Sequence, residues 1–515
     1  MPMPDSSPLS SDAPESPVAG RARSSDGVIL VVVCLAQFMV VLDVSIVNVA
    51  LPAIQSSLHF RAVDLQWVVT AYALTFGGLL LLGGRLADLF GRRRIFLVGL
   101  GLFTAASLLG GFATDQTTLI AARALQGVGA AILSPATLTI LTVTFRDQRA
   151  RAKAFGMWSA VAAGGGAAGA LFGGILTQYL SWRWILFVNV PIGIALFTVA
   201  RLRLHESKAE GPRRRLDLAG AATVTGALFL LVYAISHTDV VPWTATSTLV
   251  VLLASLVLFL AFVAIEAKVA SHPLVPLRLF RVRSVTGANL VMFCFGVGTF
   301  AMWFFLSLFL QQVLGYSPVV TGLTFLPQTV AIAAGATLSG RLSPRFGPRN
   351  VLMAGALMGA GGLFWLSFIE AGDSYWTGVC GGGILATFGM GLAFTPIALL
   401  ATGGVPHEDA GLASGLVNCS RQIGASIGLA ALTTLAASRT ATIVGATVRS
   451  GHPAGASEAL KLAMTEGYAR AFLIASVVVL AGGLLGFIIP PPGAPSTGAG
   501  WDDDADQASA PALVD

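Results

Sequence analysis

Residues 84–94 read GRLADLFGRRR, and residues 340–350 read GRLSPRFGPRN. The two segments share Gly, Arg, Leu, Phe, Gly and Arg at the same offsets and lie 256 residues apart. Each follows a long apolar run. Short basic loops with a glycine turn can arise by chance, but a match at equivalent places is typical of membrane proteins built from two related halves. The repeat therefore predicts a duplicated architecture.

The composition excludes a water-soluble protein. Of 515 residues, 55% are hydrophobic and 11% are charged, whereas soluble proteins carry about 25% charged residues. A soluble enzyme, a disordered chain and a nucleic-acid-binding protein are therefore excluded. No cluster of His, Cys and carboxylates falls inside an apolar run, so no metal site and no cofactor are expected. No GxxxxGK[ST] segment is present, so ATP is not expected to be the energy source.

Fourteen apolar runs are long enough to cross a membrane, which takes about 20 residues as a helix. We predict an all-α polytopic membrane protein in which each run forms one span. The runs are 28–50, 65–86, 95–113, 118–144, 152–176, 184–202, 216–236, 246–267, 285–309, 319–338, 350–369, 376–400, 411–436 and 468–490.

The repeat and the spans together predict six helices, two inserted helices and six more. The predicted parts are a first bundle at 28–203, a linker with two inserted helices at 204–267, and a second bundle at 268–490. Residues 1–27 and 491–515 are rich in Ser, Pro, Gly and Asp, and are expected to be disordered tails. No cleavable signal peptide is expected before residue 28.

Basic residues predict the orientation of the chain. With the N-terminus in the cytoplasm, the inner segments carry 23 Lys and Arg and the outer segments 6. This bias follows the positive-inside rule and explains the net charge of +6 without nucleic acid. Both termini are therefore predicted to lie on the cytoplasmic side. The composition, rich in Ala, Gly and Arg, suggests a GC-rich bacterium, and the plasma membrane is the expected location.

The first basic loop carries residues suited to a conformational gate. Gly91 permits a turn with positive φ, and Gly84 permits close helix approach. Asp88 lies among arginines, including Arg92, so a charge pair could latch one conformation and break in the other. The alternative is an anchor for topology made by the arginines alone. The loop resembles the cytoplasmic loop signature of the major facilitator superfamily, which implies that fold and a role in gating. In the second copy Pro344 replaces the acid, which predicts a weaker latch.

Residues 38–54, FMVVLDVSIVNVALPAI, place Asp43 well inside the first span, and no other span holds a deep acid. A charged carboxylate at this depth is costly, so it is a functional candidate. The segment resembles the first span of the fourteen-span drug:proton antiporters of the EmrB/QacA type, with Ser45 where that family usually has Thr. The resemblance implies a role in proton coupling. The alternative is a structural Asp that is permanently paired.

Residues 123–135, RALQGVGAAILSP, resemble the fourth-span signature of the same family. Arg123 and Gln126 lie at a height similar to that of Asp43, because each is a few residues outward of the centre of its span. An arginine beside Asp43 would hold it ionised, and loss of the contact would let it bind a proton. The alternative is that Arg123 extends to the outer membrane interface.

The fifth span carries regularly spaced glycines. Their spacing resembles the antiporter signature of the family, with Ala170 in place of its proline, and SWRWILFVNVPIG at 181–193 also resembles the fourteen-span branch. Such glycines allow close packing and bending, and a simple packing face is the alternative. The glycines of the motif are Gly156, Gly165, Gly169, Gly173 and Gly174.

Two residues of the second half are candidates for the substrate cavity, together with Asp43. Arg421 lies in GLASGLVNCSRQIGASIG at 411–428, which also resembles the fourteen-span branch. A charge at this depth must face a cavity or a partner, so it contacts substrate or forms a structural pair. Trp303 belongs to an aromatic span and could stack on lipophilic or cationic compounds.

The resemblance implies a proton-coupled multidrug efflux antiporter that exports lipophilic neutral or monocationic compounds by alternating access. Its expected partners are small-molecule substrates, protons and the lipid bilayer, without nucleic acid or ATP, and it is expected to be monomeric. An enzyme is not expected, because no catalytic cluster is visible. The alternatives are an exporter dedicated to one endogenous metabolite or self-made antibiotic, and an importer with the same fold.

Overall fold

The computed structural model describes residues 17–208, 216–270, 273–406, 409–449 and 456–489. Every regular element in these ranges is helical, so the predicted all-α class is confirmed. Most of the two predicted tails lies outside the described residues. Residues 17–27 are the exception, because they already belong to the first helix and the prediction of a disordered tail is wrong there.

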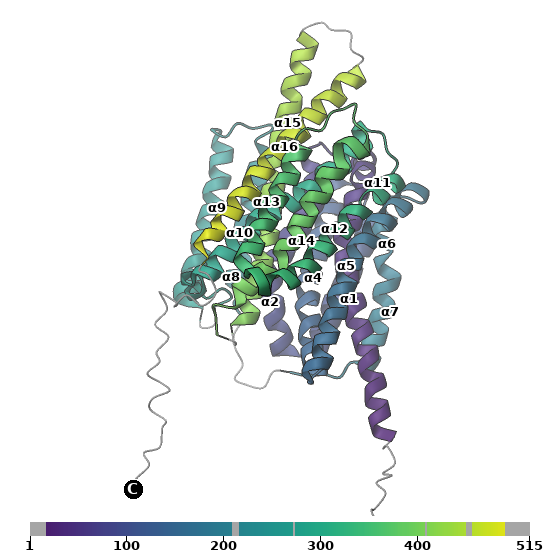
Figure 1. Cartoon of the computed structure of the whole chain (residues 1–515), viewed down its shortest axis with the longest axis vertical. Helices are drawn as coiled ribbons and strands as arrows, with labels where there is room; N and C mark the ends of the chain where they lie inside the picture. The colour runs from purple at the N-terminus through teal and green to yellow at the C-terminus, as the bar shows by residue number, and fades with distance from the viewer. Residues whose placement is uncertain (1–16, 209–215, 271–272, 407–408, 450–455, 490–515) are drawn as a thin grey trace, which may run out of the picture.

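The first bundle contains the first seven α-helices of the chain (Figure 1). The predicted span 184–202 is two helices, separated by the single residue Val188. The elements are α1 (Pro17–Leu58), η1 (Asp64–Gln66), α2 (Trp67–Phe90), α3 (Arg92–Gly111), α4 (Gln116–Thr144), α5 (Gln148–Tyr179), α6 (Trp184–Phe187) and α7 (Asn189–Arg203).

Two inserted helices, α8 (Leu218–His237) and α9 (Thr246–Ala264), precede the second bundle, and the π-helical turn η2 (Ile265–Val269) ends α9. The predicted span 319–338 is split at Phe325 into α11 and α12. The remaining elements are η3 (Leu277–Arg281), α10 (Arg283–Leu308), η4 (Phe309–Val313), α11 (Pro318–Thr324), α12 (Leu326–Phe346), α13 (Pro348–Leu366), η5 (Tyr375–Val379), α14 (Cys380–Thr402), α15 (Ala410–Arg449), α16 (Ala456–Leu485) and η6 (Gly486–Ile488).

In the described part of the chain, thirteen helical segments are long and apolar enough to cross a membrane. They match thirteen of the fourteen predicted spans. The remaining predicted span, 350–369, corresponds to α13, which is not among the thirteen. This helix has 19 residues, begins with Pro-Arg-Asn and contains several glycines, which lower its mean hydropathy. It packs along α14 and α16 inside the second bundle, so it completes the set of fourteen.

The two bundles use the same packing pattern. In the first bundle the pairs α1 with α5, α2 with α4, α3 with α4 and α3 with α7 are in contact. In the second bundle these become α10 with α15, α12 with α14, α13 with α14 and α13 with α16. The repeated loops also turn alike, since Gly91 and Gly347 have φ values of 104° and 80°. A positive φ of this kind is strained for any residue with a side chain.

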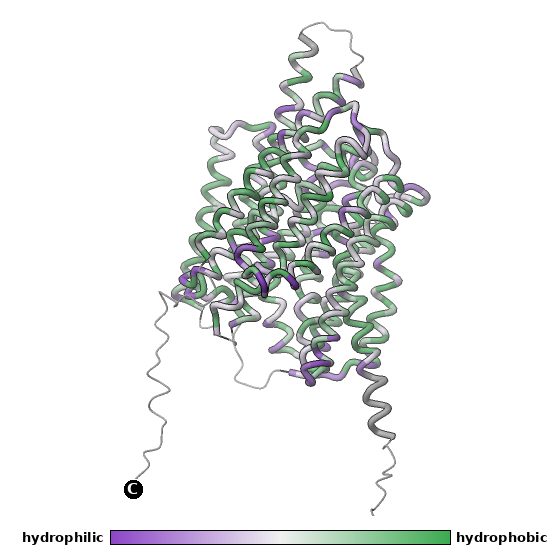
Figure 2. The backbone as a smooth tube through the Cα atoms, viewed as in Figure 1, coloured by the Kyte–Doolittle hydropathy of each residue, from purple (hydrophilic) through white to green (hydrophobic). Residues whose placement is uncertain are grey.

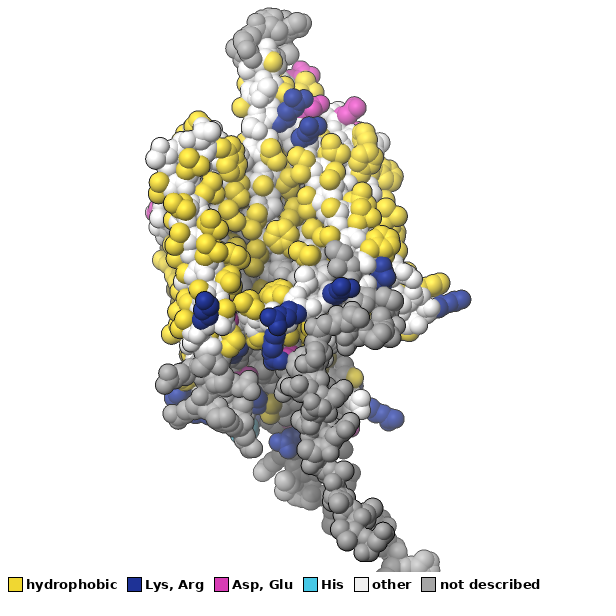
Figure 3. Space-filling view, turned by 90° about the vertical axis from the view of Figure 1, so that its left-hand side faces the viewer, with side chains coloured by type: hydrophobic (Ala, Val, Ile, Leu, Met, Phe, Trp, Pro, Cys, Tyr) yellow, Lys and Arg dark blue, Asp and Glu magenta, His cyan; other side chains and the backbone are white. Residues whose placement is uncertain are grey.

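The inserted helices cover the seam between the bundles. Helix α8 packs against α2 of the first bundle and α15 of the second, whereas α9 packs chiefly against α8. Large apolar side chains of α9, among them Leu253 and Leu260, are exposed. Figure 3 shows one face of the molecule, where a broad belt of hydrophobic side chains lies above a band of Lys and Arg. The tube in Figure 2 is likewise hydrophobic along the helices and hydrophilic near their ends.

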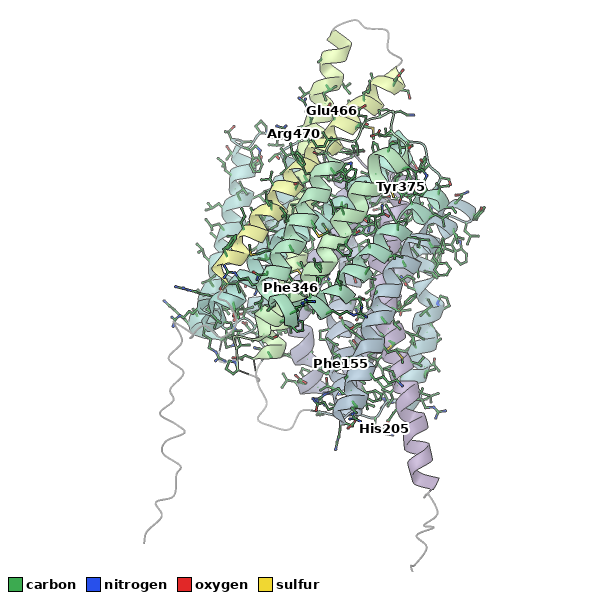
Figure 4. The ribbon with its side chains drawn as sticks, in the orientation of Figure 1. Phe155, His205, Phe346, Tyr375, Glu466 and Arg470 are labelled. Carbon is green, nitrogen blue, oxygen red and sulfur yellow. The ribbon has the colours of Figure 1, made fainter. Side chains whose placement is uncertain are left out.

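The end opposite the basic band carries a projecting helical hairpin (Figure 1). The sequence predicted no regular element for residues 437–467, but α15 continues to Arg449 and α16 begins at Ala456. Arg439 of α15 and Glu466 of α16 lie 3.7 Å apart, which ties the two arms together. Figure 4 shows Glu466 and Arg470 at this end, and Phe155 and His205 near the opposite one.

The bundles meet closely at the hairpin end. Ser307 of α10 donates to the backbone oxygen of Asn48 at 2.5 Å, and Gln312 donates to Gln55 at 2.7 Å. At the basic end α5 is largely exposed, because Ala154 is the one buried residue among 148–164. The bundles are therefore joined at the hairpin end, and the basic end, where this part of α5 is mostly exposed, is the more open one.

Candidate functional site

A buried ion pair lies inside the first bundle. Asp43 of α1 has no exposed surface, and its Oδ2 lies 2.5 Å from Nη1 of Arg123 in α4. Gln126, one turn further along α4, donates to Asp43 Oδ1 at 2.9 Å. Asn189, the first residue of α7, donates to the same oxygen at 2.9 Å. Three hydrogen-bond donors therefore surround the carboxylate in this conformation.

Arg123 is held from several sides. Its Nε donates to the backbone oxygen of Val68 at 2.9 Å, and Nη1 also donates to Gln126 at 2.9 Å. The guanidinium lies 4.6 Å from the centroid of the Tyr72 ring. Only 2% of the side chain is exposed, so Arg123 does not extend to the interface. A buried pair of this kind persists only because its remaining donors and acceptors are satisfied.

The structure thus brings together Asp43, Arg123 and Gln126, which the sequence singled out. Sequence reasoning missed Asn189, although it lies in the quoted segment at 181–193. Asparagine is neutral and common at helix ends, so no charge pattern marked it. The arrangement allows an exchange reaction: a proton on Asp43 would replace the Arg123 contact, and release of the proton would restore it.

Tyr72 lies between this pair and the second bundle. Its ring covers Arg123, and its hydroxyl is buried without a hydrogen-bond partner among the described residues. The phenol lies within electrostatic range of Asp43, Arg123 and Arg421. Tyr72 therefore contacts the ion pair of the first bundle, and its helix α2 packs against α15, which carries Arg421. A tyrosine in an apolar run gives no sign of this position in the sequence.

Arg421 has no acidic partner in the part of the chain that the structure describes. Its Nη2 and Nε donate to Asn418 Oδ1 at 3.0 and 3.3 Å. Among the described residues Arg421 therefore forms no salt bridge, which was the alternative to a substrate contact. A guanidinium that lacks a carboxylate can accept an anionic group of a ligand.

Trp303 is not part of the same group. Its ring packs edge to face on Phe325, with centroids 5.0 Å apart, at the border of the main apolar core. Gly296 of α10 packs against the backbone of Arg421. Trp303 lies about two turns further along α10, or ~10 Å away along the helix axis. The structure therefore does not bring Trp303 and Arg421 together.

The glycines of α5 divide by their neighbours. Gly165, Gly169 and Gly173 lie against α1, where a Cβ atom would come within 2.7–3.0 Å of another atom. Gly174 lies against α11 of the second bundle, where a Cβ would be 2.5 Å from a backbone oxygen. Gly156 has open space around it and packs against nothing within 4 Å. Most of the motif is thus a packing face, and its last glycine forms part of the closed end.

The basic loop shows one error in the sequence interpretation. A Cβ at Gly84 would meet only Pro135 Cβ at 3.7 Å, which is ordinary contact. The close approach is at Gly83, where a Cβ would be 2.0 Å from the backbone oxygen of Ala131 in α4. Consecutive helical residues point about 100° apart, so two adjacent glycines cannot both make the closest approach to α4.

Two acidic residues of the first half of the chain, Asp88 and Glu206, contact the segment around Gly91. Asp88 lies 3.5 Å from Arg92 and is 47% exposed. Glu206 accepts from the backbone N–H groups of Arg93 and Arg94 at 3.2 and 3.1 Å, at the N-terminus of α3. An anion is favourable there because the first N–H groups of a helix lack intrahelical partners. Glu206 follows the last residue of the bundle, and the sequence interpretation did not assign it a role.

The fold and the buried site define a multi-pass membrane transporter. Residues 33–429 match the Major Facilitator Superfamily, and the chain belongs to that family. It is 43% identical to the cephamycin export protein CmcT of Amycolatopsis lactamdurans, over 90% of this chain and 92% of that one. It is 42% identical to the puromycin resistance protein pur8 of Streptomyces alboniger, over 80% and 82%. The predicted resemblance to drug exporters is confirmed.

Solved structures show the same fold. A bacterial homologue of the human lysosomal transporter Spinster, in an inward-facing conformation, superposes with a TM-score of 0.64 at 18% identity. The match covers 90% of this chain and 97% of that one. At this identity the likeness supports the fold alone.

Proposed function

We propose that this protein is a proton-coupled antiporter that exports antibiotic-like small molecules across the bacterial plasma membrane. The observation that carries the proposal is the enclosed Asp43–Arg123 pair, an ionisable pair deep in an apolar bundle. The names of the relatives, which refer to cephamycin export and puromycin resistance, agree with export. Transport is not an enzymatic reaction, and the protein acts as a monomer without ATP.

The conformation supports alternating access, because the bundles are joined at one end only. The positive-inside rule places the basic loops and both termini in the cytoplasm. The open end then faces inward, and substrate enters between α5 and the second bundle. In the outward-facing state a proton from outside binds Asp43 and displaces Arg123; in the inward-facing state it leaves. The gradient supplies about 2.3 kcal/mol per charge per 100 mV.

The range of substrates separates two versions of this function. Relatives named for single antibiotics favour a dedicated exporter, whereas another relative, from Mycobacterium tuberculosis, is named a multidrug resistance protein. A panel of unrelated antibiotics in a host without its own pumps tests this. Raised minimum inhibitory concentrations for several classes indicate multidrug export, and a rise for one class indicates a dedicated pump. No rise for any compound would contradict export.

The charges of the site predict which compounds are carried. Asp43 is enclosed by its own hydrogen-bond partners. The six predicted spans of the second bundle, from 285–309 to 468–490, contain no Asp or Glu. A dication would lack the two negative charges that compensate its desolvation. We therefore expect protection against neutral, monocationic or weakly acidic lipophiles, and little against bis-cationic biguanides or diamidines. Inhibitory concentrations for matched mono- and dications measure this, and equal protection would contradict it.

Arg421 predicts a further distinction among substrates. The change Arg421→Gln removes the charge and keeps a hydrogen-bonding side chain. Export of carboxylate-bearing compounds is expected to fall about tenfold or more, which corresponds to one lost charge-assisted hydrogen bond of about 1.5–3 kcal/mol. Export of neutral compounds should change little. Equal loss for both classes would show that Arg421 acts on the conformation and not on the substrate.

The asymmetry of the two loops predicts unequal effects of mutation. The change Asp88→Asn breaks the pair with Arg92, so conformational exchange should slow while substrate binding is retained. The change Pro344→Ala in the second copy touches an exposed residue with no charge and should matter far less. Transport rates and binding affinities of both variants test this. Similar losses in transport at both positions would refute a one-sided latch.

A further inference from the structure

Two carboxyl side chains of the inserted helices meet near the basic end of the molecule. Asp217 is the N-cap of α8, and Glu266 lies in η2 at the end of α9. They are 8% and 5% exposed, respectively, and they lie close together, because Leu216, next to Asp217, packs in one apolar cluster with Val275, whose N–H donates to Glu266. Neither residue has a part in the ion pair of Asp43, which lies in another bundle of helices. The proposed transport mechanism therefore leaves this buried pair unexplained.

The hydrogen bonds of the two carboxyl groups leave one oxygen of each unsatisfied. Asp217 Oδ1 accepts from the N–H of Gly220 at 2.7 Å, and Glu266 Oε2 accepts from the N–H of Val275 at 3.1 Å. Asp217 Oδ2 and Glu266 Oε1 are buried without a donor in the described ranges. An ionised carboxylate only accepts hydrogen bonds. Two such groups in contact are stable when a proton between them makes one of them a donor.

The charged residues around Asp217 and Glu266 also favour one proton shared by the two carboxyl groups. Arg85 of α2 is, with Asp217, the charged group that acts on Glu266 within the described chain. Its guanidinium also donates to the backbone oxygen of Pro273, next to the segment that contacts Glu266. The adjoining cluster around Leu82 is apolar. Among the described residues one arginine lies near two buried carboxyl groups, and a proton shared by the two groups balances the second negative charge.

We propose that Asp217 and Glu266 form a second proton-binding site, which holds one proton and links the inserted helices to Arg85 of the basic loop. Loss of the proton leaves two adjacent negative charges between the N-cap of α8 and the end of α9. Their repulsion loosens this contact and strengthens the pull on Arg85. The inserted helices thereby respond to the pH on the side of the basic loops, independently of Asp43.

Infrared spectroscopy of the full-length protein in detergent tests the site without any substrate. The carbonyl band of protonated carboxyl groups should disappear from the wild-type spectrum as the pH is raised. The Glu266→Gln and Asp217→Asn variants should lack this titrating component. The matched control is Asp409→Asn, because Asp409 is similarly buried at 7% but has Arg278 as a partner at 3.0 Å. The control should keep the band.

Thermal unfolding supplies a second readout. The folded wild type holds a proton that separate carboxyl groups of the unfolded chain release, so its melting temperature should fall as the pH rises through the titration of the band. Glu266→Gln places an amide donor against Asp217, so its melting temperature should lose this dependence. An unchanged band and an unchanged pH dependence in both variants would overturn the proposal. Stabilisation by Na⁺ or Ca²⁺ instead of acid would also overturn it, in favour of a cation site.

Discussion

Substrate-induced proton release is expected to disappear when Asp43 is replaced by Asn. The amide is nearly the same shape as the carboxylate, but it cannot bind and release a proton near neutral pH. The variant would still bind substrate, because Asp43 is enclosed by Arg123, Gln126 and Asn189 and does not face the open end. The measurement is the pH change of a weakly buffered solution of solubilised protein when substrate is added.

Two further variants separate this role from folding. Removing one partner of a buried ion pair can cost about 3–5 kcal/mol, so Asp43→Asn could act through stability. Asp43→Glu keeps the titratable group and should retain part of the release. Asp64→Asn removes a surface acid that is paired with Arg61 at 2.6 Å, and it should leave the release unchanged. Undiminished proton release by a folded Asp43→Asn protein would contradict the assignment.

Adjacent glycines in α2 are expected to differ sharply in their tolerance of a single methyl group. In Gly83→Ala the new Cβ would lie 2.0 Å from a backbone oxygen of α4, which cannot move aside as a side chain can. Helices α2 and α4 would separate, and overpacking of this kind costs about 1–3 kcal/mol or more. In Gly84→Ala the nearest atom would be 3.7 Å away, and alanine favours the helix.

Melting temperatures of both variants in detergent measure this difference. Gly83→Ala should melt well below the wild type or fail to accumulate in the membrane, whereas Gly84→Ala should melt at or slightly above it. Each variant is the control for the other, because the same methyl group is added one residue away. Equal melting temperatures would show that the α2–α4 contact is looser than the structure has it.

The spans, the duplicated loops and the central pair could be predicted because each leaves a strong local signal. A run of apolar residues requires a membrane, and an acid within such a run requires a partner. Arg123 and Gln126 could be singled out because their segment resembles the family's fourth-span signature, and their depth, similar to that of Asp43, supports the link. Asn189 and Tyr72 contribute to the same site, but nothing in their own segments distinguishes them from ordinary helix residues.

Features set by contacts between distant segments could not be predicted. Single residues, Val188 and Phe325, interrupt helices inside continuous apolar runs. A proline follows each break, Pro191 and Pro327, and cannot donate the hydrogen bond that would continue the preceding helix, but the sequence interpretation did not use this signal. The hairpin of α15 and α16 is polar enough to read as a loop, although its alanines and leucines favour a helix. The Asp217–Glu266 pair joins the two ends of the inserted segment. The two side chains come together only because α8 and α9 pack side by side, and the residues around Asp217 or Glu266 in the sequence do not indicate this packing.

The most direct test of proton-coupled export uses inverted membrane vesicles in which the interior is made acidic without ATP. The vesicle interior then corresponds to the outside of the cell. The account predicts that an antibiotic accumulates inside these vesicles, that a protonophore abolishes the accumulation, and that vesicles with Asp43→Asn protein show none. Accumulation that persists without a proton gradient, or that the Asp43→Asn protein supports at the wild-type rate, would contradict it.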